Sequence, residues 1–109
     1  MMLPDRDRAR VDRAKITDYL LSLSHPDGRG KAAFFMRFGF KARDWEALAD
    51  ALREVAVRNL VTAVAESAHG TRYTVDGPLH TPDGRAPRVR TVWIVERDSV
   101  PRLITAHPL

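Results

Sequence analysis

The stretch RVRTVWIVE, residues 88–96, is the clearest indication of the fold because its side chains alternate in character. Successive side chains of an extended strand point to opposite faces. One face carries Val89, Thr91, Trp93 and Val95, and the other carries Arg88, Arg90, Val92 and Ile94. A strand of this kind belongs to a sheet that packs on helices through its apolar side. We therefore expect one covered face and one more polar face.

Three further runs around this strand have a composition typical of β-strands. They are Leu60–Glu66, Thr71–Leu79 and Arg102–Ala106. Short turns separate the runs, at His69-Gly70, Thr81-Pro82-Asp83-Gly84 and Arg97-Asp98-Ser99. Because short turns join antiparallel neighbours, the sequence predicts a four-stranded antiparallel meander.

Upstream of Asn59 the apolar residues follow a helical period instead. We predict a helix over about 12–22 with Asp12 as its N-cap, a second from near Gly30 that stops at Gly39, and a third over about Arg43–Arg58. The expected inward residues of the first two are Ile16, Tyr19, Leu20, Leu23, Phe34, Phe35 and Phe38. Residues 9–11 are expected to add a short edge strand.

These elements predict an α+β fold, with N-terminal helices packed on a four-stranded antiparallel meander sheet. A chain of 109 residues, 44% of them apolar, is expected to form a single domain over residues 1–109. Its helical half spans about residues 12–58 and its sheet half about 60–107.

The amino-acid composition indicates the cellular compartment and the kind of partner to expect. The chain has no cysteine, no apolar signal segment near its N-terminus and no stretch of membrane-spanning length, so we expect a cytoplasmic protein that does not enter a membrane. Its formal net charge is +4 and its pI is about 10.1, which suits an anionic partner such as RNA. The arginine content is equally explained by a GC-rich genome.

The connection His25-Pro26-Asp27-Gly28-Arg29-Gly30-Lys31 is the most suggestive candidate site. An imidazole, cationic side chains and two glycines beside a helix start can approach a phosphate. The structural alternative is a tight turn in which His25 caps the preceding helix and Lys31 is solvated. Motif matches of this kind have a high false-positive rate, so both interpretations stay open.

A second candidate site lies on the strands. Arg88 and Arg90 share a face, and the arginines spread over the neighbouring β segments are Arg72, Arg85, Arg88, Arg90, Arg97 and Arg102. Near the C-terminus, Thr105 and His107 lie on one strand face, where the imidazole can act as an acid or base. The alternative is an ordinary solvated surface.

No motif points to a metal or cofactor. His69 and His80 are expected at surface turns, and the four histidines have no metal-binding spacing. Nucleotide-binding glycine loops and the GxSxG motif are absent.

Three segments resemble a family of uncharacterised bacterial proteins, a domain of unknown function. They are LPDRDRARVDRAKITDYLLSLSHPDGRGKAAFF (residues 3–35), GTRYTVDGPLHTPDGR (70–85) and RTVWIVERDSVPRLITAHP (90–108). Members look like stand-alone small proteins or toxin-like tails of secreted proteins. Their layout is similar to the metal-independent ribonucleases of the barnase, EndoU, colicin and RelE superfamily. This second likeness is one of fold, which by itself does not imply function.

The resemblance implies a set of site residues. The family pattern His-Pro-x-Gly with a following basic residue matches His25, Pro26, Gly28 and Lys31, and its closing motif matches Arg90, Trp93, Arg102, Thr105 and Pro108. The chain departs from the family pattern at Gly30, Ala33 and His107, where the family commonly has histidine, arginine and tyrosine. If one of those family residues performs acid–base work, the departure weakens or abolishes activity.

The leading hypothesis is a toxin-like endoribonuclease without cofactor. The catalytic candidates are His25, Lys31, Arg90, Thr105 and His107, with Arg72, Arg88 and Arg102 binding substrate. Its partners would be RNA and a small acidic antitoxin or immunity protein. The alternative hypotheses are a non-catalytic module that binds nucleic acid or protein, and a structural partner subunit. The sequence leaves the oligomeric state and the RNA target open.

Overall fold

The computed structural model of the protein describes residues 1–109 and has the predicted α+β class. Its helical elements are η1 (Arg6–Arg8), α1 (Arg13–Lys15), η2 (Ile16–Leu20), α2 (Arg29–Arg37), η3 (Ala42–Asp44) and α3 (Trp45–Arg58). Its strands are β1 (Val61–Ser67), β2 (Gly70–Pro78), β3 (Arg88–Val95) and β4 (Arg102–Pro108). The helices therefore precede the whole sheet in the chain.

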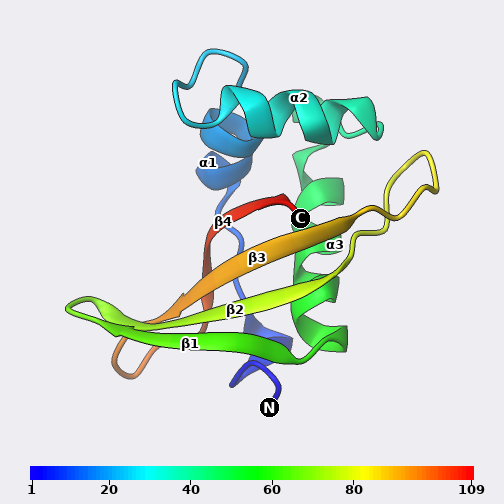
Figure 1. Ribbon diagram of the computed structural model, residues 1–109. Helices are drawn as coiled ribbons and strands as arrows, with labels where there is room; N and C mark the ends of the chain where they lie inside the picture. The colour runs from blue at the N-terminus through cyan, green and yellow to red at the C-terminus, as the bar shows by residue number, and fades with distance from the viewer.

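The sheet is the predicted meander. Its strands lie in the order β1-β2-β3-β4, and each neighbouring pair is antiparallel. In Figure 1, α3 lies behind the sheet, whereas α1 and α2 lie together at one end of the molecule. The β1–β2 hairpin projects away from these helices. None of the helices is both long enough and apolar enough to span a lipid bilayer.

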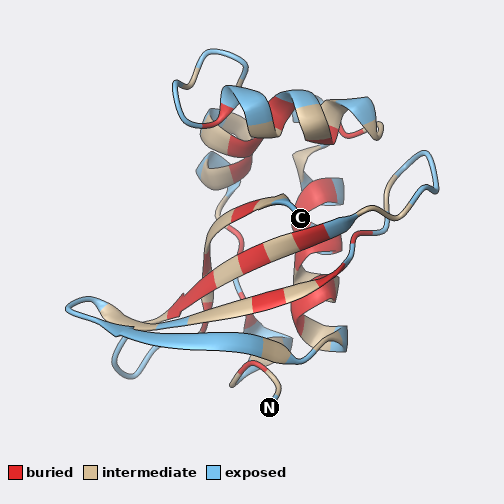
Figure 2. Ribbon diagram, viewed as in Figure 1, coloured by how far each residue is buried: buried red, intermediate tan, exposed pale blue.

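The alternation predicted for β3 sets the two faces of the sheet. Val89, Thr91 and Trp93 are fully buried, and Figure 2 shows this stripe along the strand. Thr91 is buried without an unsatisfied hydroxyl: the indole N–H of Trp93 donates to it at 2.8 Å, and it donates to the Val75 carbonyl at 2.8 Å. The core beneath this face therefore includes a closed hydrogen-bonded unit.

One residue departs from the two-face pattern. Ile94 is only 5% exposed, although it lies on the face predicted to be the more polar one. Its cross-strand neighbours are Arg72 and Arg102. The aliphatic stems of long cationic side chains can cover apolar surface in this way.

The first helix differs from the prediction. Residues 13–15 form a single α turn, and η2 then continues as a π-helix, in which the Leu21 N–H donates to the Ile16 carbonyl at 2.7 Å. A π-turn adds a residue to the turn and rotates the side chains that follow. The helix ends at Leu20, so Leu23 lies in the following turn and is 60% exposed instead of buried. Asp12 occupies the predicted N-cap position, but its carboxylate pairs with Arg10 at 3.0 Å and accepts no capping hydrogen bond.

The other two helices follow the prediction closely. α2 ends before Gly39, which adopts a φ of 102°, a conformation that favours glycine. Of the phenylalanines expected to point inward, Phe35 is fully buried, whereas Phe34 and Phe38 are half-buried. α3 begins at Trp45, two residues later than expected, because residues 42–44 form the short η3 turn.

In place of the edge strand predicted for residues 9–11, the structure has a single parallel bridge between Arg10 and Arg102. The Arg10 N–H donates to the Pro101 carbonyl at 2.8 Å, and the Leu103 N–H donates to the Arg10 carbonyl at 2.9 Å. This contact ties the chain just before α1 to β4. The helices α1 and η2 therefore start beside the last strand of the sheet.

Candidate functional site

The face of the sheet opposite the Trp93 side carries almost all of the strand residues predicted to be functional. We call it the polar face. Cross-strand pairing arranges it in rows, because paired residues point to the same side. The rows are Asp76–Arg90–His107, Thr74–Val92–Thr105 and Arg72–Ile94–Arg102, with Arg88 beyond the first row.

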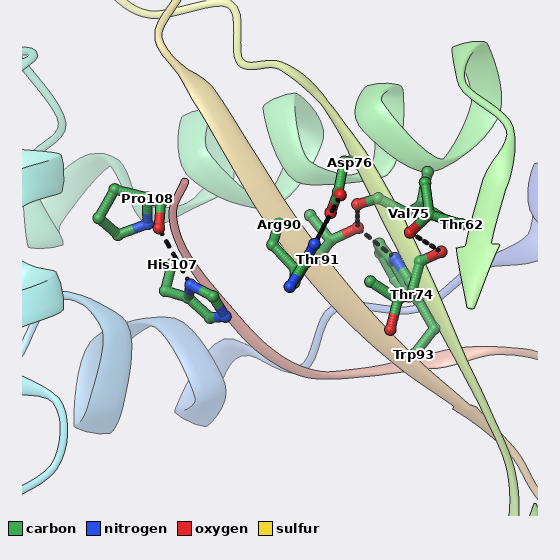
Figure 3. Close-up of polar contacts among 9 residues, drawn as sticks. All are labelled: Thr62, Thr74, Val75, Asp76, Arg90, Thr91, Trp93, His107 and Pro108. Atoms are coloured by element: carbon green, nitrogen blue, oxygen red, sulfur yellow. Dashed lines mark hydrogen bonds and ion pairs between the residues drawn. The ribbon is translucent and has the colours of Figure 1, made fainter. Parts of the chain in front are cut away.

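Arg90 is held in the first row by a two-point ion pair. Its Nε donates to Asp76 Oδ1 at 2.9 Å and its Nη2 to Oδ2 at 3.0 Å (Figure 3). These hydrogen bonds hold the pKa of Asp76 below its usual value; partial burial opposes the shift, while the positive charges of Arg90, Arg88 and His107 add to it. The Asp76 side chain is only 11% exposed. This row is therefore one compact cluster of charge.

Tyr19 of η2 joins the N-terminal helices to the second row. Its hydroxyl lies 3.0 Å from Thr105 Oγ1, and either oxygen can donate. The ammonium groups of Lys15 and Lys31 lie 5.2 Å and 5.1 Å from the centre of its ring. The His25 ring packs edge-on against it, with 5.0 Å between the ring centres. One phenol thus brings together residues of α1, α2, the His25 turn and β4.

The environment of Tyr19 favours its charged form. Partial burial is the largest single influence and raises the pKa of Tyr19, but it is outweighed. The neighbouring polar groups of Lys31 and Thr105 lower this pKa, and the charges of Lys31 and Lys15 add to that effect. The net pKa of Tyr19 lies below its usual value.

The His25–Gly28 turn brings Lys31 to this position. His25 Nδ1 accepts the backbone N–H groups of Asp27 at 3.0 Å and Gly28 at 3.1 Å, so only Nε2 is free for other partners. A Cβ at Gly28 would collide with the Tyr19 backbone carbonyl, which is why only glycine allows this close approach. Lys31 Nζ donates to the Asp27 carbonyl at 3.2 Å. The turn therefore has a structural role as well as being near the site.

The predicted residues fall into three groups on the structure. His25, Lys31 and Thr105 meet around Tyr19, whereas Arg90, His107 and Arg88 gather around Asp76. Arg72 and Arg102 lie at the far end of the polar face, and Arg102 is paired there with Glu96 at 3.0 Å. His107 Nδ1 lies 3.1 Å from the Pro108 carbonyl (Figure 3).

Sequence reasoning missed Tyr19, Lys15 and Asp76. The apolar stripe predicted for the first helix includes Tyr19, although the spacing of Lys15 and Tyr19, four residues apart, places a cation near the phenol in a helical turn. For Asp76 no local signal exists, because its partner is fixed by the register of β2 against β3.

The polar face is an open surface. A cavity of about 520 Å³ lies elsewhere, between the end of α2, the start of α3 and the turn at residues 81–84. Its lining includes Gly39, Lys41, Arg43, Glu46 and Pro82. No three His, Asp or Glu side chains are grouped so that they could hold a metal ion.

Comparison with known proteins identifies a family and a structure with the same fold. The family described as a domain of unknown function, DUF6883, matches residues 2–109. A chain of a solved structure from Klebsiella pneumoniae 342, described as a contact-dependent growth inhibition toxin and immunity protein complex, has the same fold. The TM-score is 0.73 at 20% identity, over 94% of this chain and 95% of that one. No curated protein matches the sequence.

Proposed function

This chain belongs to the DUF6883 family, and from that premise we propose that it is a toxin-like, metal-independent endoribonuclease that uses the polar face of its sheet. The observation that carries the proposal is the Tyr19–Thr105 contact at 3.0 Å, with Lys31 beside the same ring. Through it, a cation from the helical half lies next to the face that holds Arg90 and His107. One phosphodiester can then contact groups from both halves of the chain.

The reaction would be a transesterification within the RNA backbone. A base removes the proton of a ribose 2′-hydroxyl, whose oxygen forms a bond to phosphorus, and the bond from phosphorus to the 5′-oxygen breaks as an acid protonates that oxygen. His25 and His107 are the histidine candidates for proton transfer. Lys31 and Arg90 would stabilise the pentavalent phosphate, and Thr105 would orient the attacking group. Arg72, Arg88 and Arg102 would hold neighbouring phosphates.

The related fold supports a toxin-like role, because that structure is described as a toxin and immunity protein complex. A net charge of +4 favours the toxin side of such a pair over the immunity side. Positive charge attracts RNA and also an inhibitor of opposite sign. We therefore expect a small acidic antitoxin or immunity protein as partner, and the cytoplasm, where RNA is the substrate, as the place of action.

The proposal is tested by incubating the purified chain with total RNA in the presence of EDTA. We expect the wild type to cleave RNA and Lys31→Ala and Arg90→Ala to lose roughly 100-fold or more in rate. Matched controls are Lys41→Ala and Arg43→Ala, both at the separate cavity. RNA left intact by the wild type, or equal losses in the controls, would contradict the proposal.

A second function, a non-catalytic module that binds nucleic acid, is favoured by two observations. The polar face has no enclosed cavity, and Arg90 is already engaged at two points by Asp76. Expression in growing cells separates the two functions. A ribonuclease should arrest growth and the Lys31→Ala variant should not, whereas a binding module should be harmless in both forms.

A further inference from the structure

Tyr19 is surrounded by more positive charge than a packing role requires. A tyrosine that only filled space would need one hydrogen-bond partner for its hydroxyl. Here the ring has an ammonium on Lys15 at 5.2 Å, another on Lys31 at 5.1 Å, and the Thr105 hydroxyl at 3.0 Å from its oxygen. Both ammonium groups lie close enough to stabilise a negative charge on the phenolic oxygen.

The histidines near the site are less well arranged to accept a proton. Nδ1 of His25 is occupied by two backbone N–H groups, and its ring lies edge-on to Tyr19. His107 lies on the next row of the polar face, opposite Arg90. The phenolic oxygen of Tyr19 lies where the helices meet the sheet, 3.0 Å from Thr105 Oγ1.

We propose that Tyr19 is the catalytic base of this site and acts on the ribose of an RNA substrate. The inference rests on the proposed function. The phenolate oxygen takes the 2′-hydroxyl proton as the 2′-oxygen bonds to phosphorus, and the imidazolium of His107 gives a proton to the departing 5′-oxygen. The products are a 2′,3′-cyclic phosphate and a free 5′-hydroxyl, so atoms and charge balance without a co-reactant.

The neighbours of Tyr19 have separate roles in this step. Lys15 of α1 and Lys31 of α2 stabilise the phenolate, while Thr105 of β4 donates to it and fixes its direction. His25, in the turn between the helices, is the other titratable group against the ring. α3 packs on η2 but contributes no charge that alters the pKa of Tyr19.

The first measurement is steady-state cleavage of an oligonucleotide with a single ribonucleotide in a DNA backbone, with the all-DNA strand as blank. We expect Tyr19→Phe to lower kcat by roughly 10²- to 10⁴-fold with little change in KM. Tyr73→Phe is the matched control, because Tyr73 is the chain's only other tyrosine and packs against the core. It should keep near-wild-type values for both parameters.

The pH dependence of the cleavage rate distinguishes a catalytic Tyr19 from one that only supports the fold. In the wild type the rate should rise with pH as Tyr19 ionises. Lys15→Ala removes one charge that favours the phenolate, so this rise should move to higher pH, and Lys15→Arg should restore it. A merely structural tyrosine would leave the profile unmoved.

These experiments distinguish failure of the Tyr19 proposal from failure of the proposed function. Cleavage by the wild type with a fully active Tyr19→Phe variant overturns the role of Tyr19 and leaves the proposed function intact, whereas an inactive wild type overturns both. If Tyr19→Phe does not fold, tyrosinate absorbance of Tyr73→Phe reports Tyr19 alone. Ionisation of Tyr19 at or above the pH found for N-acetyl-tyrosinamide then overturns the inference, and ionisation at lower pH supports it.

Discussion

Asp76 and Arg90 form the best-defined ion pair of the polar face. Both guanidinium contacts are within 3.0 Å, and the Asp76 side chain is 11% exposed against 41% for Arg90. The pair draws the Arg90 guanidinium toward β2, in the row that also contains His107. Because Arg90 stays partly in water, the pair contributes little net stability. Its larger effect is on which way the guanidinium points.

The Asp76 pair predicts a pH dependence of stability. Since the pKa of Asp76 is lowered in the folded state, chiefly by hydrogen bonds from Arg90, its carboxylate stabilises the fold above the unfolded-state pKa of about 3.9. That contribution is lost as pH falls through the folded-state pKa. Asp76→Asn should thus be less stable than wild type at pH 7, and the gap should close in acid. Urea unfolding at both pH values measures it.

Asp98→Asn is the control for this experiment, because the Asp98 side chain is 95% exposed. Its free energy of unfolding should stay parallel to that of the wild type at every pH. If the difference in free energy of unfolding between wild type and Asp76→Asn widened in acid, the stabilising role of this ion pair would be contradicted.

Helix α2 determines where Lys31 lies. A glycine is required just after its C-terminal end, at Gly39, but not in its first turn, at Gly30. At its end, Gly39 has a φ of 102° and a Cβ there would lie 3.1 Å from Pro82 Cβ. In its first turn, a Cβ added at Gly30 would have no atom within 4 Å. Gly39 is needed for the turn toward η3, whereas Gly30 only adds flexibility to the unfolded chain.

Alanine substitutions at these glycines should therefore have opposite effects. Gly39→Ala places a side chain in the left-handed region and should cost roughly 1–2 kcal/mol in the free energy of unfolding. Gly30→Ala improves helix propensity and should add about 0.5–1 kcal/mol. The shift of the urea midpoint at constant slope is the measurement. Similar shifts of the same sign would show that the ends of α2 are not as described.

Across the whole molecule, the two faces of the sheet have opposite tasks. One face buries Trp93 in the core. The other carries arginines from three strands, with Arg88 near one end of the face and Arg72 and Arg102 near the other. Arg72 pairs with Ile94, which is six positions from Arg88 along β3. Because each strand residue adds about 3.3 Å, roughly 20 Å separates the two arginines, and they can reach different phosphates of one RNA strand. This separation predicts additive, salt-dependent contacts.

Binding of a 2′-O-methyl oligonucleotide, which cannot be cleaved through its 2′-oxygen, tests this layout. Arg72→Ala and Arg88→Ala should each weaken binding and lower the slope of log affinity against log salt by about 0.7. Fluorescence anisotropy over a salt series gives the slope. Arg43→Ala, at the distant cavity with a 77% exposed side chain, should leave it unchanged. An equal change in that control would place RNA elsewhere.

Local pattern alone determined the meander, the two faces of β3 and the third helix, because each depends on the period of apolar residues within a few turns or strands. It also predicted that Thr105 and His107 share a face, since alternation along one strand is a local property. The π-helix at residues 16–20 is not predicted by local pattern, because the apolar spacing there indicates an ordinary α-helix.

Tertiary structure alone decided the composition of the candidate site. Asp76 meets Arg90 only through the register of two strands, and Tyr19 meets Thr105 only because the chain before α1 is bridged to β4. Contacts between residues 86 positions apart depend on how whole elements pack. The sequence contains the groups that can do chemistry, and long-range packing selects which of them share one surface.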